Sequence, residues 1–425
     1  MSARDYALWE LDRKRLPGWR PGLFRHRVAP PADERDRDLA ERIVAGVVKN
    51  HLHLLMLMAH WSGRSLKSID ILAQKILAIG LYQLRFLDRV PAPAAVYETV
   101  ELARRAGRRR AAGFINAVLR NALSKPPPAL PDRSADPAGY ARLVLSHPPE
   151  LFERLAGEYG IATALRLAEH NQQEPPTVVR LYRGARAEDL AAEGVSVIPH
   201  RQPGMVVVQG ARKGLLGAWA ERGLAQVQDP TSARAAAALD IRSGQRVLDR
   251  CCGAGTKTFQ ICEMLGETGS IVAVDRSADR CALLREMLKR RGISNVAVVN
   301  ADMLAGAEGI GPESFDRILI DAPCSNSGVL ARRPEARYTQ SQRNIASLAK
   351  LQDRILDDTA PLLRPGGLLL YSTCSLWPEE NHRRIESFIR RHTRYRVLWQ
   401  LDITPSLDAD ATDYHDGGYM ALLTA

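Results

Sequence analysis

Two cysteines of this 425-residue chain stand in short polar segments that each follow an apolar run. Cys324 comes after RILIDAP, and Cys374 comes after LLLYST. A thiolate can add to an electron-poor ring carbon, and a second thiol can serve as the acid or base of the same reaction. Proline before Cys324 and hydroxyl residues around both cysteines are unusual choices for filling a core. The pattern therefore predicts catalysis rather than packing for Cys374 and Cys324.

Such chemistry suits methylation of a cytosine at carbon 5, because that atom attacks a methyl group poorly until a thiolate has added to carbon 6. A free thiol has a pKa of about 8.5, so a nearby positive charge is needed to ionise it at neutral pH. Lys257, at the start of a predicted helix, offers that charge. Asp321 is predicted to bind the ring at N3 and at its exocyclic amine, which stabilises the ring during attack.

Three further segments at predicted strand ends indicate an adenosyl cofactor. The first is the loop 251–257 (CCGAGTK), where glycines let a ligand approach the backbone and the following helix offers unpaired amides. The second is Asp275, in the position of acids that bind ribose hydroxyls, and the third is Asp302, suited to accept from an adenine amine. Each acid alone could equally cap a helix, but the ordered set favours an adenosyl ligand.

These residues belong to a stretch in which predicted strands and helices alternate. Continuous apolar strands separated by helices predict an α/β, Rossmann-like domain whose parallel sheet is covered on both faces. The segments 396–401 and 419–423 are predicted to add an antiparallel hairpin at one edge. Ligands bind such a sheet at the carboxyl ends of its strands, where the two cysteines are expected to meet. The predicted strands are 245–251, 270–275, 296–301, 317–321 and 368–372, and the predicted helices are 257–265, 278–291, 343–363 and 379–391.

The first third of the chain differs in charge and in periodicity. Residues 1–125 hold 23 Lys and Arg against 12 Asp and Glu, whereas the remainder holds 36 of each class. Apolar residues recur at helical spacing over 33–123, and the run RRAGRRR at 104–110 is strongly basic. A basic helical module suggests a front that recruits a polyanion, with a merely solvated helical surface as the plain alternative.

The chain is predicted to have four parts. Proline-rich composition marks a linker after the helical front. Short helices over 149–170 and strands at 178–181, 195–198 and 205–208 follow it, in a pattern that assigns no fold by itself. The parts are a helical RNA-binding domain (1–125), a linker (126–140), a small α+β RNA-binding region (141–228) and the α/β domain (229–425).

Several features argue against other classes of protein. The six cysteines include no CxxC pair, so neither zinc nor another metal is expected. The most apolar stretch, 51–61 (HLHLLMLMAHW), is too short for a membrane span and is predicted to be a buried helix. The N-terminus lacks the apolar region of a secretory signal. We therefore expect a cytoplasmic monomer without a membrane partner.

Longer strings around these residues resemble the RNA cytosine-5 methyltransferases. DAPCSNSGVLARRPEARY and LLYSTCSLWPEENHRRIESFI are similar to motifs four and six of that family, and VLDRCCGAGTKT is similar to its motif one, LDxCAAPGGKT. The front segments IGLYQLRFLDRVPAPAAVYETVELARR and GFINAVLRN resemble a NusB-like RNA-binding domain. Together they cover nearly the whole chain, which is identified by this combination as a member of the bacterial RsmB (Sun/Fmu) type.

The resemblance implies a Rossmann-like class I methyltransferase domain behind an all-α NusB-like domain and a small α+β region. It implies S-adenosylmethionine-dependent methylation of carbon 5 of a cytosine in RNA, with small-subunit (16S) ribosomal RNA of the cytosine 967 type as substrate. Cys374 would be the nucleophile that forms an adduct at carbon 6, and Cys324 would be the base for release. The implied cofactor-binding residues are Cys251, Cys252, Gly253, Ala254, Gly255, Thr256, Lys257, Asp275, Arg280, Asp302 and Asp321.

The chain departs from the family pattern at several positions. Ala254 stands where the family has proline and Thr256 where it has glycine, which puts cofactor affinity in question because a side chain replaces close backbone approach. Arg250 replaces an apolar residue, Tyr338 a tryptophan and Tyr182 an asparagine. Two alternatives stay open: a tRNA or another ribosomal cytosine as target, or a catalytically inactive RNA-binding or assembly factor. A titration with S-adenosylmethionine separates the inactive factor from an enzyme.

Overall fold

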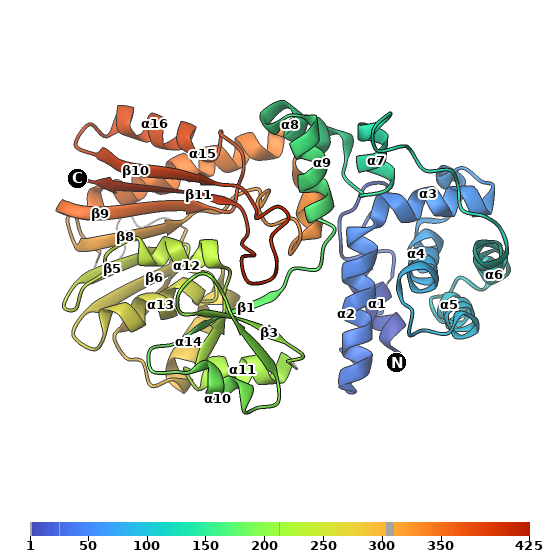
Figure 1. Ribbon diagram of the computed structural model, residues 1–425, viewed down its shortest axis with the longest axis horizontal. Coiled ribbons are helices and arrows are strands. Elements are labelled where there is room, and N and C mark those ends of the chain that lie inside the picture. The colour runs from blue at the N-terminus through green and yellow to red at the C-terminus, as the bar shows by residue number, and fades with distance from the viewer. Residues whose placement is uncertain (1, 25, 212, 303–309) are drawn as a thin grey trace. The chain divides into compact units, whose positions relative to one another are not determined.

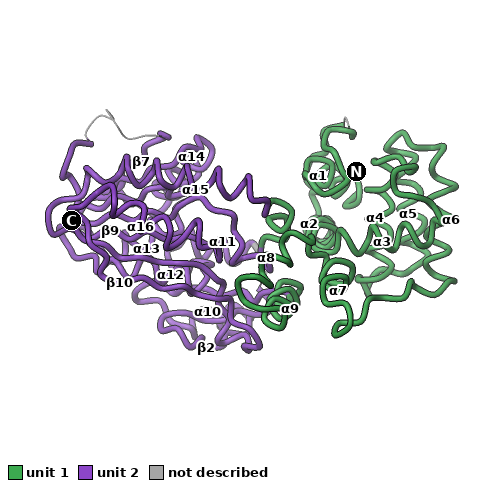
Figure 2. Tube along the Cα trace, turned by 90° about the horizontal axis from the view of Figure 1, so that it is seen from above, with its two compact units in different colours: residues 1–173, 333–339 green, residues 174–332, 340–425 purple. Residues whose placement is uncertain are grey.

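The computed structural model describes residues 2–24, 26–211, 213–302 and 310–425 of the chain (Figure 1). The chain forms two compact units, which Figure 2 distinguishes by colour. Unit 1 comprises Met1–Gln173 and Arg333–Thr339, and unit 2 comprises Glu174–Arg332 and Gln340–Ala425. The two units are defined by their compactness and not by function. The predicted division into four functional parts therefore stays a prediction.

Unit 1 is helical throughout its described part. Asp33 and Asp70 begin α2 and α4, where their carboxylates accept backbone amides of the first turn. The apolar side chains of α4 are buried among the neighbouring helices, and the predicted helix over 51–61 is α3, with Leu54 and Trp61 in the core. The elements are α1 (Ala3–Asp12), α2 (Glu34–Lys49), α3 (His51–Ser62), η1 (Leu66–Ser68), α4 (Ile71–Phe86), α5 (Ala92–Arg105), α6 (Arg109–Ser124), α7 (Pro137–Leu143), α8 (Pro149–Tyr159), α9 (Ile161–His170) and the distant η2 (Pro334–Thr339).

The helix η2 supplies buried side chains to unit 1. Arg337 is only 1% exposed and donates to the carbonyl oxygens of Lys49 and Leu145 at 3.1 and 3.3 Å. The Tyr338 hydroxyl donates to the Val48 carbonyl oxygen at 2.9 Å. These bonds satisfy carbonyl groups near the end of α2 and after α7, which explains why seven residues from far along the chain belong to this unit.

Among the described residues, no single helix has the length and apolarity needed to cross a bilayer. The pair α2 and α3 passes that test only together and is bent by 83° at its break.

The first part of unit 2 is a small antiparallel sheet with strand order β2-β3-β1-β4. The predicted strands at 178–181, 195–198 and 205–208 are confirmed within one or two residues, and β4 was not predicted. The elements are β1 (Thr177–Leu181), α10 (Ala187–Ala191), β2 (Ser196–Pro199), β3 (Met205–Gln209), α11 (Lys213–Glu221) and β4 (Ala225–Val227).

The main sheet has the order β10-β11-β9-β8-β5-β6-β7 in the described part of the chain. Strands β5 to β9 are mutually parallel, and β11 runs antiparallel to both β9 and β10, so the predicted edge hairpin is confirmed. The predicted fold class, a Rossmann-like sheet behind a helical domain, is confirmed as well. The elements are α12 (Pro230–Ala237), β5 (Arg246–Arg250), α13 (Thr256–Leu265), β6 (Ser270–Asp275), α14 (Ala278–Arg290), β7 (Val296–Asn300), β8 (Phe315–Asp321), α15 (Gln342–Thr359), η3 (Ala360–Leu362), β9 (Leu363–Thr373), α16 (His382–Arg391), β10 (Arg396–Ile403) and β11 (Gly418–Thr424).

Each face of this sheet carries its own core. Leu248 of β5 packs with residues of α15 and α16, whereas the adjacent Val247 packs with residues of α12, α13 and α14. Successive side chains of a strand point to opposite faces, so neighbouring residues of one strand pack into both layers.

Two predicted helices have different bounds in the structure. The helix predicted over 343–363 ends at Thr359, because Pro361 has no amide hydrogen with which to continue it, and β9 already begins at Leu363. The helix predicted over 379–391 begins only at His382, since Glu380 and Asn381 form a turn in which their amides donate to Trp377 and Pro378.

Candidate active site

The two cysteines follow neighbouring parallel strands. Strand β8 ends at Asp321 and β9 at Thr373, with Asp321 in register with Ser372. Both thiols are half-buried, and the Cys324 thiol is hydrogen-bonded to Cys374. The sheet therefore brings the two predicted residues together at the carboxyl ends of its parallel strands, as the strand order requires.

The Cys324 thiol holds its proton firmly. Its hydrogen bond to Cys374, its burial and the negative charges of Cys374 and Glu380 raise its pKa well above the ordinary value. Cys324 is thus a neutral hydrogen-bond donor toward Cys374.

Lys257 and Asp321 form an ion pair beside the cysteines. Lys257 lies in the first turn of α13, and its Nζ is 2.6 Å from Asp321 Oδ2. The Ser372 hydroxyl donates to the other carboxylate oxygen, Oδ1, at 3.0 Å. Burial acts to lower the pKa of Lys257, but the charges of Asp321 and Cys374 outweigh it and the pKa is raised. The lysine therefore stays cationic next to the thiol that would have to ionise.

Asp249, in the middle of β5, was not among the predicted site residues. It is fully buried and accepts the Thr258 hydroxyl at 2.6 Å. Burial raises its pKa to about 7. An acidic residue directly after the apolar pair Val247 and Leu248 was the available signal, since such a group is costly to bury without a role or a partner.

The loop after β5 is bent sharply. Cys251, Gly253 and Gly255 all have positive φ, and a Cβ on Gly255 would lie 2.4 Å from Leu284 Cδ1. Only glycine fits at Gly255, which immediately precedes α13. The predicted cofactor loop therefore turns sharply into the amino end of α13, with Ala254 exposed.

Asp275 ties this loop to the end of β6. Its two carboxylate oxygens accept the amides of Gly253 and Ser277 at 2.9 and 2.8 Å. Arg280 follows in the first turn of α14 with an exposed side chain. Each carboxylate oxygen can accept a second bond, so Asp275 can still meet a ribose hydroxyl.

Asp302 is exposed just beyond β7, and its carbonyl oxygen accepts a bond from Arg250. Arg250, a departure from the family pattern, is 2% exposed and lies 3.5 Å from the buried carboxylate of Asp358. In this chain a buried ion pair between Arg250 and Asp358 therefore lies next to the backbone of Asp302, the residue predicted to bind the adenine amine.

The remaining predicted cofactor residues are two neighbouring cysteines. Cys252 is buried, and its thiol donates to the Gly253 carbonyl oxygen at 3.7 Å. Burial raises the pKa of Cys251 to about 12, so this thiol stays protonated and differs from a reactive cysteine.

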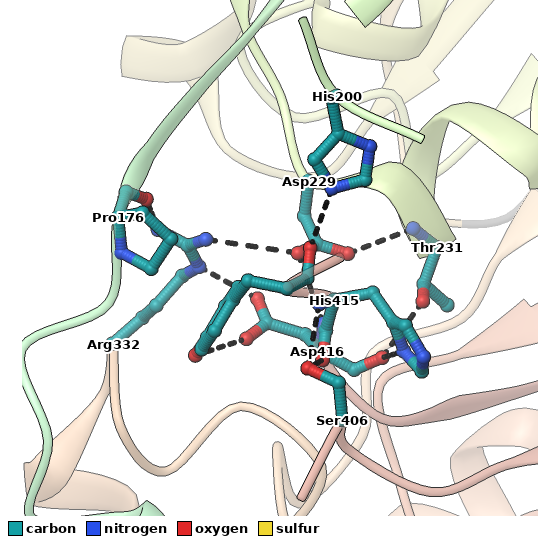
Figure 3. Close-up of polar contacts among 9 residues, drawn as sticks. Pro176, His200, Asp229, Thr231, Arg332, Ser406, His415 and Asp416 are labelled. Carbon is teal, nitrogen blue, oxygen red and sulfur yellow. Dashed lines mark hydrogen bonds and ion pairs between the residues drawn. The ribbon is translucent and has the colours of Figure 1, made fainter. Parts of the chain in front are cut away.

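A charged cluster supports the same edge of the sheet from the loop before β11. In Figure 3, Arg332 and Asp416 point toward each other, with Arg332 Nε 2.8 Å from Asp416 Oδ2. The Asp416 amide donates to Asp229 at 3.0 Å, and the Thr231 hydroxyl donates to the Asp416 carbonyl oxygen at 2.7 Å. Burial, followed by the charge of Asp229, raises the pKa of Asp416 to about 7.

This cluster connects to Cys374 through the backbone. The Gly417 amide donates to the Gly328 carbonyl oxygen at 2.8 Å, and the Gly328 amide donates to the Cys374 carbonyl oxygen at 2.9 Å. A Cβ on Gly328 would lie 2.5 Å from the Gly417 oxygen, so the segments touch backbone to backbone. Asp229, Arg332 and Asp416 were not among the predicted site residues.

Comparison with known proteins identifies the chain's relatives. A family model described as 16S rRNA methyltransferase RsmB/F matches residues 236–418, and the NusB family model matches residues 23–124. Ribosomal RNA small subunit methyltransferase B of Pseudomonas syringae pv. tomato is 35% identical over 371 residues, which is 86% of this chain and 81% of that protein. The chain belongs to the RsmB/F methyltransferase family.

Two further relatives extend this result. Probable ribosomal RNA small subunit methyltransferase B of Bacillus subtilis is 32% identical over 368 residues, covering 84% of this chain and 81% of that protein. The crystal structure of PH0851 has the same fold, with a TM-score of 0.78, 23% identity and coverage of 93% and 91% of the two chains. As an RsmB/F member, the protein is an S-adenosylmethionine-dependent RNA methyltransferase with a NusB domain at its front.

Proposed function

We propose that this RsmB/F enzyme methylates carbon 5 of one cytosine in small-subunit ribosomal RNA, the cytosine 967 type, through a covalent adduct between Cys374 and carbon 6. The observation that carries the proposal is the meeting of two thiols at adjacent strand ends beside the Lys257–Asp321 pair. The names of the curated relatives support a small-subunit ribosomal RNA as substrate.

In the first step the Cys374 sulfur bonds to carbon 6, and the electron pair of the C5–C6 double bond moves toward carbon 5. Lys257 stabilises the thiolate that begins this step. Asp321, held by Lys257 and Ser372, accepts from the exocyclic amine and from N3, which takes up a proton from solvent as attack at carbon 6 makes the ring more basic, and so stabilises the electron-rich ring. N3 gives up that proton again when Cys374 leaves. S-adenosylmethionine supplies the methyl group that carbon 5 then takes.

Release requires a base, and we assign it to Cys324. Its high pKa depends first on the hydrogen bond to Cys374 and also on the charge of Cys374. A Cys374 sulfur bonded to carbon 6 is an uncharged thioether and a weaker acceptor. The pKa of Cys324 therefore falls, although burial and the charge of Glu380 still raise it, and its proton passes to solvent. The Cys324 thiolate then removes the proton on carbon 5, the C5–C6 double bond forms again, and Cys374 leaves as a thiolate.

The described residues fit the cofactor. The glycine-bearing backbone of the loop 251–257 would meet its methionine part, with Asp275 on the ribose, Asp302 on the adenine amine and Arg280 nearby. Thr256 and Ala254 carry side chains where the family has glycine and proline, so these two positions set how closely the backbone is approached.

The experiment is bisulfite mapping of cellular RNA with the gene present, deleted, and restored as wild type or as Cys374→Ala. The proposal predicts that one cytosine of 16S ribosomal RNA is protected only when the wild-type enzyme is present. Loss of protection in a tRNA would instead identify the other substrate class. An unchanged map in all four strains would contradict a cytosine-5 methyltransferase.

A further inference from the structure

The two cysteine loops share one buried carboxylate. Glu380, 0% exposed, lies in the turn between β9 and α16. Its Oε2 accepts the hydroxyls of Ser325 and Ser375 at 2.5 Å each, and its Oε1 accepts the Ser325 amide at 2.9 Å. Ser325 follows Cys324 and Ser375 follows Cys374, so a single side chain is bonded to both loops immediately after their thiol residues.

Neighbouring bonds hold this carboxylate in place. Gln352 Nε2 donates to Glu380 Oε1 at 3.2 Å and to the Pro323 carbonyl oxygen at 3.0 Å, which reaches the residue before Cys324. The Tyr371 hydroxyl donates to the Glu380 carbonyl oxygen at 2.7 Å. The turn is therefore fixed from β9 and from α15.

Only a carboxylate suits this arrangement, because its two oxygens accept without donating. Glutamine has one acceptor oxygen, so its amide group would face either the two serine hydroxyls or the Ser325 amide and Gln352 Nε2, and those donors would lose their acceptor. Burial raises the pKa of Glu380, opposed by the hydrogen bonds from Ser325, Ser375 and Gln352. A buried carboxylate that needs four hydrogen-bond donors is costly to assemble. Because it is bonded to both cysteine loops, its position indicates that it holds these loops together.

We propose that Glu380 is a positioning residue of the two-thiol reaction, one that sets the distance between Cys374 and Cys324 by binding both loops. The inference rests on the proposed function. If the loops separate, Cys374 can still attack carbon 6, but Cys324 no longer reaches the proton on carbon 5. The methylated adduct then forms and is released slowly.

The test compares wild type, Glu380→Gln and Glu380→Ala, with the adjacent and more exposed Glu379→Gln as matched control. Each is incubated with an unmodified 16S rRNA transcript and methyl-labelled S-adenosylmethionine. The readouts are the single-turnover rate of methyl transfer, the KM for RNA and the fraction of protein–RNA adduct that survives a denaturing gel. Cys324→Ala marks the trapped adduct, and Cys374→Ala marks its absence.

In both Glu380 variants we expect adduct release to slow by about 100-fold, the effect of a displacement near 1 Å. The KM for RNA should fall together with kcat, because adduct release then limits turnover. Glu379→Gln should behave as wild type. Two results overturn the inference: wild-type turnover without adduct, or a loss of methyl transfer without any adduct, which indicates a purely structural role. If Glu380→Ala does not fold, Glu380→Gln decides. If Cys324→Ala traps no adduct, the proposed function fails first.

Discussion

Two lysine–aspartate pairs, one in each unit, have nearly the same geometry and opposite surroundings. Lys75 and Asp12 of unit 1 are 2.7 Å apart with side chains 0% and 3% exposed. Lys257 and Asp321 of unit 2 are 2.6 Å apart with side chains 12% and 29% exposed. The first pair is sealed in a helical core, and the second remains accessible at the end of a strand.

The partners of the two pairs differ as well. Lys75 also donates to the Arg20 carbonyl oxygen, and Asp12 also accepts the Phe24 amide, so the sealed pair fastens the segment after α1. Burial lowers the pKa of Lys75 despite the hydrogen bond to Asp12, whereas the pKa of Lys257 is raised. The groups around an ion pair thus decide whether it can only stabilise the fold or can also take part in a reaction. Of these two pairs, only Lys257 and Asp321 have a thiol, that of Cys374, beside them.

Breaking the sealed pair should give the largest effect on stability. Lys75→Met leaves the Asp12 carboxylate buried without its cation, so we expect the free energy of unfolding to fall by about 3–5 kcal/mol. Methylation per folded molecule should remain near wild type at a temperature where the variant stays folded. Denaturant titration followed by an activity assay checks both, and an unchanged unfolding midpoint would contradict a structural pair.

The same substitution in the open pair should do the reverse. Lys257→Met removes the charge that stabilises the Cys374 thiolate and orients Asp321, so kcat should fall by about 100- to 1000-fold. The melting temperature should fall less than in Lys75→Met, because the Asp321 side chain is 29% exposed and stays partly solvated without its lysine. Turnover and melting curves of Lys257→Met and Lys75→Met, measured side by side, check this. A larger loss of turnover in Lys75→Met than in Lys257→Met would contradict the assigned roles.

We predict that unit 1 contributes charge to RNA binding rather than chemistry, and a salt titration tests this. Arg109 and Arg110 are exposed at the start of α6. Their joint replacement by alanine should reduce the slope of log K against log salt by about 1.5, if both contact phosphates. The paired control is Arg222→Ala with Arg242→Ala in unit 2, whose side chains are 60% and 72% exposed. Equal slopes for both double variants would contradict the RNA-binding role predicted for unit 1.

Asp249, the buried acid near Lys257 and Asp321, predicts that the free energy of unfolding depends on pH, as the smallest of these effects. The folded pKa of Asp249 is about 7, against an ordinary value of 3.8. Between these values Asp249 binds more protons in the folded chain than in the unfolded one, so its contribution to the free energy of unfolding decreases as the pH rises from about 4 to 7. Asp249→Asn should flatten this dependence and leave the part due to Asp416, whereas the exposed Asp240→Asn should not. Denaturant titrations across this range measure it, and an unaltered slope in Asp249→Asn would be the contrary result.

The sequence predicted the site where strand order decides position. Alternating apolar strands and helices predicted a parallel sheet, and a parallel sheet puts the ends of β8 and β9 at one edge, so Cys324 and Cys374 were expected to meet. The same pattern could not reveal Glu380, because 379–391 has the periodicity of a helix and the turn at Glu380 depends on bonds to Ser325 and Ser375 far away in the chain.

Long-range placement accounts for the other omissions. The seven residues of 333–339 carry no local signal that Arg337 belongs in the helical unit, because its partners are backbone carbonyl groups of α2 and of the segments after α7 and α9. Asp249 was visible as an acid in a strand, but only the surrounding sheet and helices show that it is fully buried.

The most direct test of the two-thiol account is a denaturing gel of Cys324→Ala after incubation with 16S rRNA and methyl-labelled cofactor. The account predicts a slow-migrating protein–RNA band that carries the label and is absent from the double variant Cys374→Ala, Cys324→Ala. Normal turnover by Cys324→Ala with no such band would contradict it.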